Sequence, residues 1–128
     1  MMKQGATKIL ALVSDLLFTV KINEAAKRNG MQIDYVKNDD DFLARLHEKP
    51  APKLVIMDLN ISSASPVELI EKIKGQEETK AISVLGYVSH IQGDLKVKAQ
   101  EAGADAVLAR SAFSQNLVQI LKRHSGMP

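Results

Sequence analysis

The sequence contains no cysteine and no tryptophan, and aromatic residues make up only 4% of its 128 residues. Without cysteine, neither a disulfide framework nor a thiolate metal site can form. The histidines, His47, His90 and His124, lie far apart in the sequence, which argues against a zinc site. The scarcity of aromatic side chains argues against a base-stacking platform and against an aromatic carbohydrate site. We therefore expect an aliphatic core, with neither redox nor zinc chemistry.

The sequence also has little excess charge and no long apolar run. Its 17 Lys and Arg are interspersed with 15 Asp and Glu, so the net charge is +2 and no basic stripe for nucleic acid forms. No run approaches the ~18 apolar residues of a membrane span, and residues 1–8 lack the pattern of a signal peptide. We predict a cytoplasmic protein that binds neither nucleic acid nor membrane. A single domain should cover residues 1–128, with its core from about residue 8 to residue 124.

Short apolar segments alternate along the chain with segments of helical periodicity. The predicted strands are 8–13, 31–36, 53–58, 81–88 and 105–109, and the predicted helices are 14–29, 38–46, 65–75, 92–102 and 114–124. Strict alternation requires right-handed crossovers and a parallel sheet with helices on both faces. We therefore expect an α/β, flavodoxin-like, doubly wound (βα)5 fold, with a five-stranded parallel sheet in the order 2-1-3-4-5.

Helix starts are marked at several places by capping residues. Ser14 and Asp15 can cap the first helix, and Ser114 can cap the last. The segment 65–68, Ser-Pro-Val-Glu, has the pattern of a capping box with proline at the first helical position. The first helix is indicated by apolar residues that recur at roughly helical spacing: Leu16, Leu17, Val20, Ala25 and Ala26.

Ligands of doubly wound sheets bind beyond the carboxyl ends of the strands. Asp58 ends the third predicted strand, Val88 lies 30 residues later and Arg110 lies 52 residues later. These positions, together with the segment Gly103-Ala104-Asp105-Ala106, resemble the receiver domain of two-component response regulators from Lys8 to His124. In that family a phosphoacceptor Asp, a Thr or Ser, and a Lys end the third, fourth and fifth strands. The resemblance places Asp58 at the phosphoacceptor position.

The pocket departs from the family pattern at several positions. In the family, an acid pair after the first strand holds Mg²⁺, which neutralises the charge that builds on the phosphoryl oxygens. In this sequence Val13 and Ser14 stand at the positions of that acid pair. Asp15 is the nearest acid, and a shift of one residue would bring it into range. Val88 lacks the expected hydroxyl, which Ser89 would supply if the strand end slipped by one. Arg110 replaces the lysine and is not equivalent to it.

The loop after Asp58 departs as well, since Ser62 and Pro66 stand where the family usually has Pro and then Gly. Together these differences indicate a pseudo-receiver with a degenerate pocket. No cofactor is required, and Mg²⁺ at Asp15 and Asp58 should bind weakly. We expect no enzyme activity and no catalytic residue, since the sequence has neither a G-x-S-x-G elbow nor a His beside a predicted nucleophile.

Structural alternatives exist for each of these residues. Asp58 can cap a loop or pair with Arg110, and Asp15 can serve as the N-cap of the first helix. His90 falls in a loop, where solvation is expected rather than catalysis. The acidic run 39–41 lies at a helix start, where carboxylates are favoured without any metal.

Val97 lies off the apolar stripe of the fourth helix and is flanked by lysines, which indicates an exposed position. Together with Tyr87 and Phe113 it marks a candidate interaction face around the fourth helix, fifth strand and fifth helix. Receiver-like domains commonly dimerise or bind partners there, so this face is a candidate for a homodimer contact or for a partner. The resemblance implies a signalling partner, either a histidine kinase or a downstream effector.

The sequence thus predicts an atypical receiver that signals through protein–protein contacts without phosphorylation. An alternative is a working phosphoacceptor of a phosphorelay that uses Asp58 with Asp15, Ser89 and Arg110. A third is a small-molecule binder on a flavodoxin-like fold, although no glycine-rich phosphate loop occurs.

Overall fold

The computed structural model describes residues 7–89 and 93–124. Five parallel strands form one sheet in the order β2-β1-β3-β4-β5, which confirms the predicted flavodoxin-like fold. The central strand β3 is buried over its first four residues and becomes half-buried at its last, Asp58. The strands are β1 (Lys8–Leu12), β2 (Gln32–Val36), β3 (Leu54–Asp58), β4 (Ser83–Val88) and β5 (Ala106–Ala109).

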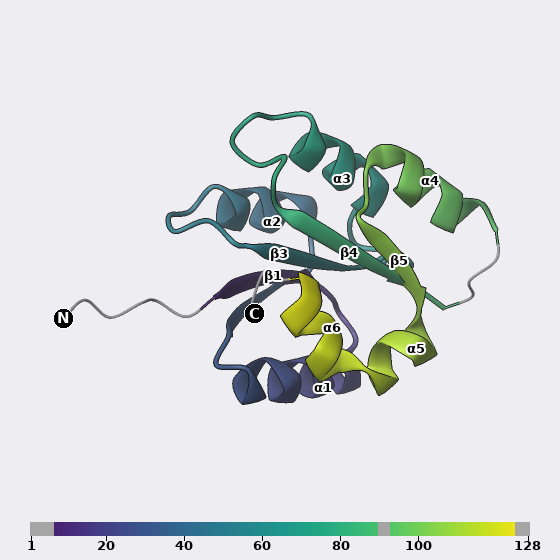
Figure 1. Cartoon of the computed structure of the whole chain (residues 1–128). Helices are drawn as coiled ribbons and strands as arrows, with labels where there is room; N and C mark the ends of the chain where they lie inside the picture. The colour runs from purple at the N-terminus through teal and green to yellow at the C-terminus, as the bar shows by residue number, and fades with distance from the viewer. Residues whose placement is uncertain (1–6, 90–92, 125–128) are drawn as a thin grey trace.

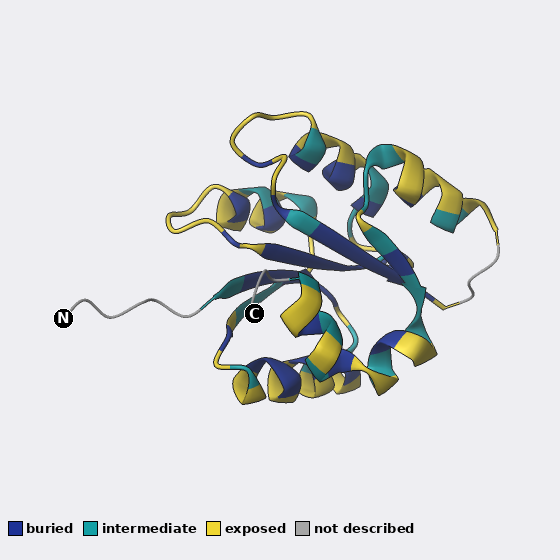
Figure 2. Ribbon diagram, viewed as in Figure 1, coloured by how far each residue is buried: buried dark blue, intermediate teal, exposed yellow. Residues whose placement is uncertain are grey.

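Helices cover both faces of the sheet (Figure 1). They are α1 (Leu16–Arg28), α2 (Asp39–Leu46), α3 (Pro66–Lys74), α4 (Asp94–Ala102), α5 (Arg110–Gln115) and α6 (Leu117–His124). One core cluster lies beneath α2, α3 and α4, and a second lies between the opposite face and α1, α5 and α6. In Figure 2 the strands β3 and β4 and the inward faces of the helices are mostly dark blue, the edge strand β5 is largely teal, and the outward faces of the helices are mostly yellow.

The apolar residues of α1 do not all face the core. Leu16 and Leu17 are each 78% exposed and Val20 is 54% exposed. The spacing of apolar residues therefore predicted the helix correctly but did not predict which of its faces packs on the sheet. The buried face begins at Phe18 and continues through Ile22, followed by Ala25 and Ala26. Phe18 faces inward because its ring packs against other aromatic rings under the sheet. The two leucines are therefore left on the surface of α1.

The predicted last helix is two helices. Arg110 begins α5 directly after β5. This helix ends at Gln115, and the non-helical residue Asn116 separates it from α6. Ser114 lies inside α5, where its hydroxyl accepts a hydrogen bond from Lys21 Nζ at 3.2 Å, so its prediction as a helix cap is wrong. The apolar residues 117–121 that indicated this helix all lie in α6, so their periodicity did not mark the break at Asn116.

The start of α3 is only partly as predicted. Pro66 occupies the first helical position, as expected, but the Ser65 side chain makes no capping hydrogen bond, so the predicted capping box does not form. The backbone N–H of Ser65 instead donates to Asp39 Oδ1 at 2.8 Å. This bond ties the start of α3 to the start of α2.

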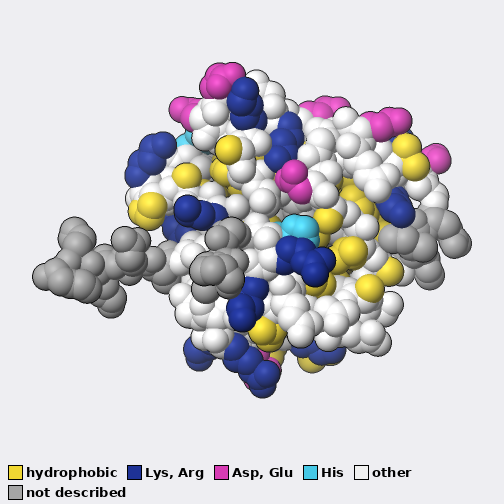
Figure 3. Space-filling model, in the orientation of Figure 1, with side chains coloured by type: hydrophobic (Ala, Val, Ile, Leu, Met, Phe, Trp, Pro, Cys, Tyr) yellow, Lys and Arg dark blue, Asp and Glu magenta, His cyan; other side chains and the backbone are white. Residues whose placement is uncertain are grey.

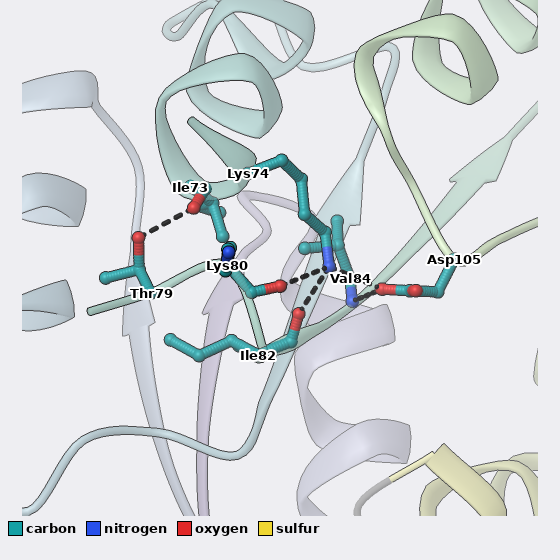
Figure 4. A network of polar contacts seen from close by, with 7 residues as sticks. All are labelled: Ile73, Lys74, Thr79, Lys80, Ile82, Val84 and Asp105. Atoms are coloured by element: carbon teal, nitrogen blue, oxygen red, sulfur yellow. Dashed lines mark hydrogen bonds and ion pairs between the residues drawn. The ribbon is translucent and has the colours of Figure 1, made fainter. Parts of the chain in front are cut away.

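A partly exposed polar network at the opposite end of the sheet from Asp58 joins α3 to the entrance of β5 (Figure 4). Lys74 Nζ donates to Ile82 O at 2.7 Å, to Asp105 Oδ2 at 3.0 Å and to Lys80 O at 3.2 Å. Asp105 Oδ2 also accepts from the Val84 backbone N–H at 2.7 Å. One carboxylate thus satisfies an ammonium group and a backbone donor on the sheet.

Asp105→Ala is expected to lower the free energy of unfolding by about 0.5–1.5 kcal/mol, because the part-buried Val84 N–H loses this acceptor, while Lys74 keeps its bonds to Ile82 O and Lys80 O. Urea unfolding at neutral pH measures the change. Glu77→Ala is the matched control: its carboxylate pairs with Lys80 at 2.9 Å on an exposed helix-like turn, and its loss should cost less than about 0.5 kcal/mol. Equal losses in the two variants would contradict the structural role of Asp105.

Candidate functional site

The sequence-predicted site residues lie at the carboxyl edge of the sheet. Asp58 ends β3 and pairs in register with Tyr87 of β4. Asp15 follows β1, and Arg110 follows β5. The fold therefore brings the ends of four strands to one edge, as the resemblance implies.

Asp15 and Arg110 form an ion pair. The Arg110 guanidinium donates to Asp15 Oδ2, while Asp15 Oδ1 accepts from the backbone N–H of Phe18 at 3.2 Å. The predicted N-cap role of Asp15 is confirmed, and the ion pair that the sequence suggested between Arg110 and Asp58 is instead made with Asp15. The long arginine side chain reaches across to α1, where its guanidinium carbon lies 4.8 Å above the Phe18 ring. The hydrogen bonds from Phe18 N–H and from Arg110 lower the pKa of Asp15.

Asp58 is half-buried and belongs to a different hydrogen-bond chain. Its Oδ1 accepts from the backbone N–H of Asn60 at 2.9 Å, and Asn60 Oδ1 accepts from the backbone N–H of Ser89 at 2.8 Å. Burial raises the pKa of Asp58, against smaller effects of the Asn60 hydrogen bond and of the Arg110 charge. Sequence analysis missed Asn60, although an Asp side chain commonly accepts a hydrogen bond from the backbone N–H two residues on.

The remaining predicted pocket residues add no negatively charged ligand for a hard cation. Val13 and Val88 are buried at 0% and 1% exposure, and Ser14 and Ser89 are exposed. Within residues 7–89 and 93–124, no three His, Cys, Asp or Glu side chains lie together as a metal ligand set. Mg²⁺ prefers an octahedral set of oxygen ligands with strong charge. Asp58, with Asp15 engaged elsewhere, does not fit that requirement.

The two aspartates are expected to affect stability in opposite directions. Because burial raises the pKa of Asp58, its ionised form costs stability as pH rises through that pKa, so Asp58→Asn should stabilise the protein at pH 7. Because the pKa of Asp15 is lowered, its stabilisation is present at pH 7 and is lost as pH falls below the ordinary value of 3.8. Asp15→Asn should therefore destabilise at pH 7 and have little effect in acid.

Urea unfolding of the wild type and both variants at two pH values checks these signs. A loss of stability in Asp58→Asn at pH 7 would contradict the conclusion that burial of the ionised Asp58 carboxylate has a net cost. A loss of stability in Asp15→Asn that is the same at low pH as at pH 7 would contradict a stabilising role of the Asp15 charge.

An aromatic cluster lies beneath the ion pair. The ring of Tyr87 lies 4.7 Å from Phe18 and stacks on Phe113 at 5.1 Å. Tyr87 is 1% exposed and Phe113 is 0% exposed, so their prediction as members of an interaction face is wrong. The side chains of Tyr87, on β4, and Phe113, on α5, point toward α1 and pack in the core there. The Tyr87 hydroxyl has no hydrogen-bond partner among the described residues, and burial raises its pKa.

Other residues offer a surface near β5. Val97 is 49% exposed, as predicted. Hydrophobic side chains gather over β5 between α4 and α6 in Figure 3. A cavity of about 280 Å³ near β5 is lined by residues of β5, α5 and α6, among them Leu108, Ala112 and Ile120. Homodimerisation through this face stays a prediction.

The remaining predictions concern His90 and the acidic run. His90 lies outside the described residues. The run 39–41 opens α2 behind the N-cap Asn38, whose side-chain oxygen accepts from Asp41 N–H at 2.8 Å. The acidic side chains thus lie at a helix start, in agreement with the structural interpretation.

Comparison with known proteins identifies related sequences and folds. The family model described as the response regulator receiver domain matches residues 14–122. The acid tolerance regulatory protein ActR of Rhizobium meliloti (strain 1021) is 29% identical over 124 residues, which cover 95% of this chain and 62% of that protein. ActR of Sinorhizobium medicae (strain WSM419) is 28% identical over the same share. The chain therefore spans less than two thirds of these relatives.

Solved structures with the same fold are more distant in sequence. The phosphorylated cyanobacterial phytochrome response regulator RcpA has a TM-score of 0.82 at 18% identity, with 93% of this chain and 94% of that chain covered. The chemotaxis response regulator CheY4 of Vibrio cholerae has a TM-score of 0.79 at 18% identity, with 92% and 98% covered. HP1043, an orphan response regulator of H. pylori, has a TM-score of 0.77 at 18% identity, with 96% and 99% covered. In the described part of the chain, no helix has the length and apolar character needed to cross a membrane.

Proposed function

Because this chain belongs to the response regulator receiver family of two-component signalling, we propose that it transmits its signal through protein contacts, without phosphorylation of Asp58. Receiver domains are signalling modules that interact with histidine kinases or effectors, and one of these is the expected partner. The proposal concerns this domain alone, since the curated relatives extend beyond it.

The observation that supports the proposal is the ion pair between Asp15 and Arg110. This pair engages Asp15, which could otherwise help to hold Mg²⁺, and Arg110, which could otherwise contact a phosphoryl group. With valine at positions 13 and 88, Asp58 has neither an acid pair to hold Mg²⁺ nor a hydroxyl at the end of β4. Phosphoryl transfer relies on such charge neutralisation and positioning. We expect that any Mg²⁺ binding at Asp58 is weak.

The contact surface we propose is the α1 apolar patch, formed by the exposed side chains of Leu16, Leu17 and Val20. Large aliphatic side chains exposed together on one helix mark a protein interaction site more often than isolated ones do. A hollow of about 480 Å³ lies beside the patch, between α1 and β2, and has Tyr35 and Lys37 in its lining. A partner side chain can enter there while the partner covers the patch.

A working phosphoacceptor is the competing function. It is favoured by the half-buried position of Asp58 at the strand end and by the exposed Ser89, whose N–H donates to Asn60 Oδ1. The charge of Arg110 also acts on Asp58. This function would require Arg110 to leave Asp15 when a phosphoryl group arrives.

Labelling with a small phosphodonor separates the two functions. Wild-type protein incubated with acetyl phosphate and Mg²⁺ is expected to show no added phosphoryl mass by intact mass spectrometry. The variant Ser14→Asp/Val88→Thr/Arg110→Lys, which restores three family residues at exposed or strand-end positions, serves as the matched gain-of-label control. Label on the wild type that disappears in Asp58→Asn would overturn the proposal.

A further inference from the structure

A second cavity lies beside the Asp58 site, between α1 and α5. This α1–α5 cavity has a volume of about 420 Å³, and Asp58 is not part of its lining. Its size falls within the range of small-molecule sites, which is roughly 300–1,000 Å³. The lining residues are Asp15, Leu17, Phe18, Lys21, Ser89, Arg110, Ser111 and Ser114.

The charged residues of the cavity favour an anion. Two cationic side chains, Lys21 and Arg110, face one carboxylate, Asp15, so the lining carries net positive charge. A guanidinium has five N–H donors, and the hydrogen bond to Asp15 uses part of that capacity. Lys21 has three donors, and it donates to the Ser114 hydroxyl at 3.2 Å. Planar carboxylates match the fork of an arginine side chain especially well.

The remaining wall is apolar. Leu17 is 78% exposed on this side of α1, and Phe18 lies beneath the Arg110 guanidinium. Covering Leu17 would remove apolar surface from water, which stabilises a bound apolar group. An inorganic ion would leave this wall uncovered. The three serine hydroxyls can each donate or accept a hydrogen bond at the rim.

We propose that the α1–α5 cavity binds a small amphipathic carboxylate, whose anionic group contacts Lys21 and Arg110 and whose apolar body covers Leu17. The proposal goes beyond the proposed function, because it assigns a ligand to a cavity that Asp58 does not line. The bound carboxylate competes with Asp15 for Arg110. Since Asp15 caps α1, ligand binding acts on the start of the helix that carries the α1 apolar patch.

Titration of the full chain with benzoate, followed by amide NMR, tests the proposal. Saturable shifts are expected at Lys21, Arg110, Ser111 and Ser114. Benzamide has the same shape without the charge and should bind at least about tenfold more weakly, since hydrogen bonds to charged groups are the stronger ones. Inorganic phosphate, which has no apolar body, should also bind more weakly than benzoate.

Three exposed positions of α1 supply variants that should not disturb the fold. Lys21→Gln should weaken benzoate binding about tenfold, whereas Lys27→Gln, on the same helix but outside the cavity, should leave it unchanged. Leu17→Ser should weaken benzoate and leave phosphate unaffected. Equal affinities for benzoate and benzamide, equal effects of the two lysine variants, or shifts scattered over the surface would each overturn the proposal.

Discussion

Replacing Ile22 by alanine is expected to lower the free energy of unfolding by about 2–5 kcal/mol, because it leaves a cavity in the core. Ile22 is 0% exposed and packs in the core cluster beneath α1. Leu17→Ala in the same helix should change stability by less than about 0.5 kcal/mol, since Leu17 is 78% exposed. The two substitutions remove similar aliphatic groups from the same helix, so the difference between their stability losses reports the difference in burial of the two side chains.

Urea unfolding of both variants, with unchanged slope against denaturant, provides the comparison. A large loss in Leu17→Ala would show that this side chain is buried in the folded protein and would remove the α1 apolar patch. A small loss in Ile22→Ala would contradict the observed orientation of α1.

Phe113→Ala is expected to lower the free energy of unfolding by about 3–5 kcal/mol, the usual loss for a buried aromatic side chain. Phe113 is 0% exposed and touches the rings of both Tyr87 and Phe18. Tyr87→Phe, in contrast, should leave stability unchanged or raise it. It removes a buried hydroxyl that has no partner in the described part of the chain, and an unpaired buried polar group is costly.

The same unfolding measurement distinguishes these outcomes. A marked loss of stability in Tyr87→Phe would mean that the hydroxyl is hydrogen-bonded, for example by a buried water. Little change in the free energy of unfolding of Phe113→Ala would instead indicate that this side chain lies on an exposed interaction face.

The sequence predicted the architecture because the fold depends on a coarse pattern. Five apolar runs, alternating with helical segments, determine a parallel sheet and its crossovers, and the capping role of Asp15 is local as well. The orientation of α1 was not predictable in the same way. Leu16 and Leu17 are as apolar as Phe18, and only the aromatic rings contributed by β4 and α5 decide which face is buried. This information is tertiary and is absent from the spacing within the helix.

The candidate site was predicted in its position and only partly in its contacts. Asp58, Asp15 and Arg110 follow from strand ends and family spacing, since parallel strands bring their carboxyl ends together. The choice of Asp15 over Asp58 as the partner of Arg110 depends on side-chain reach across the edge of the sheet. The contact between Asn60 and Ser89 depends in the same way on how two loops meet. Neither contact is encoded by residue type alone.

The central claim is that the Asp58 pocket does not receive a phosphoryl group. Titration of the wild type with Mg²⁺ and beryllofluoride, an acyl-phosphate mimic, tests it most directly when followed by amide NMR, with Asp58→Asn as the control. The account predicts that the signals of Asp58, Ser89 and Arg110 stay in place at millimolar metal. Saturable shifts at these three residues that vanish in Asp58→Asn would show a working phosphoacceptor and contradict the account.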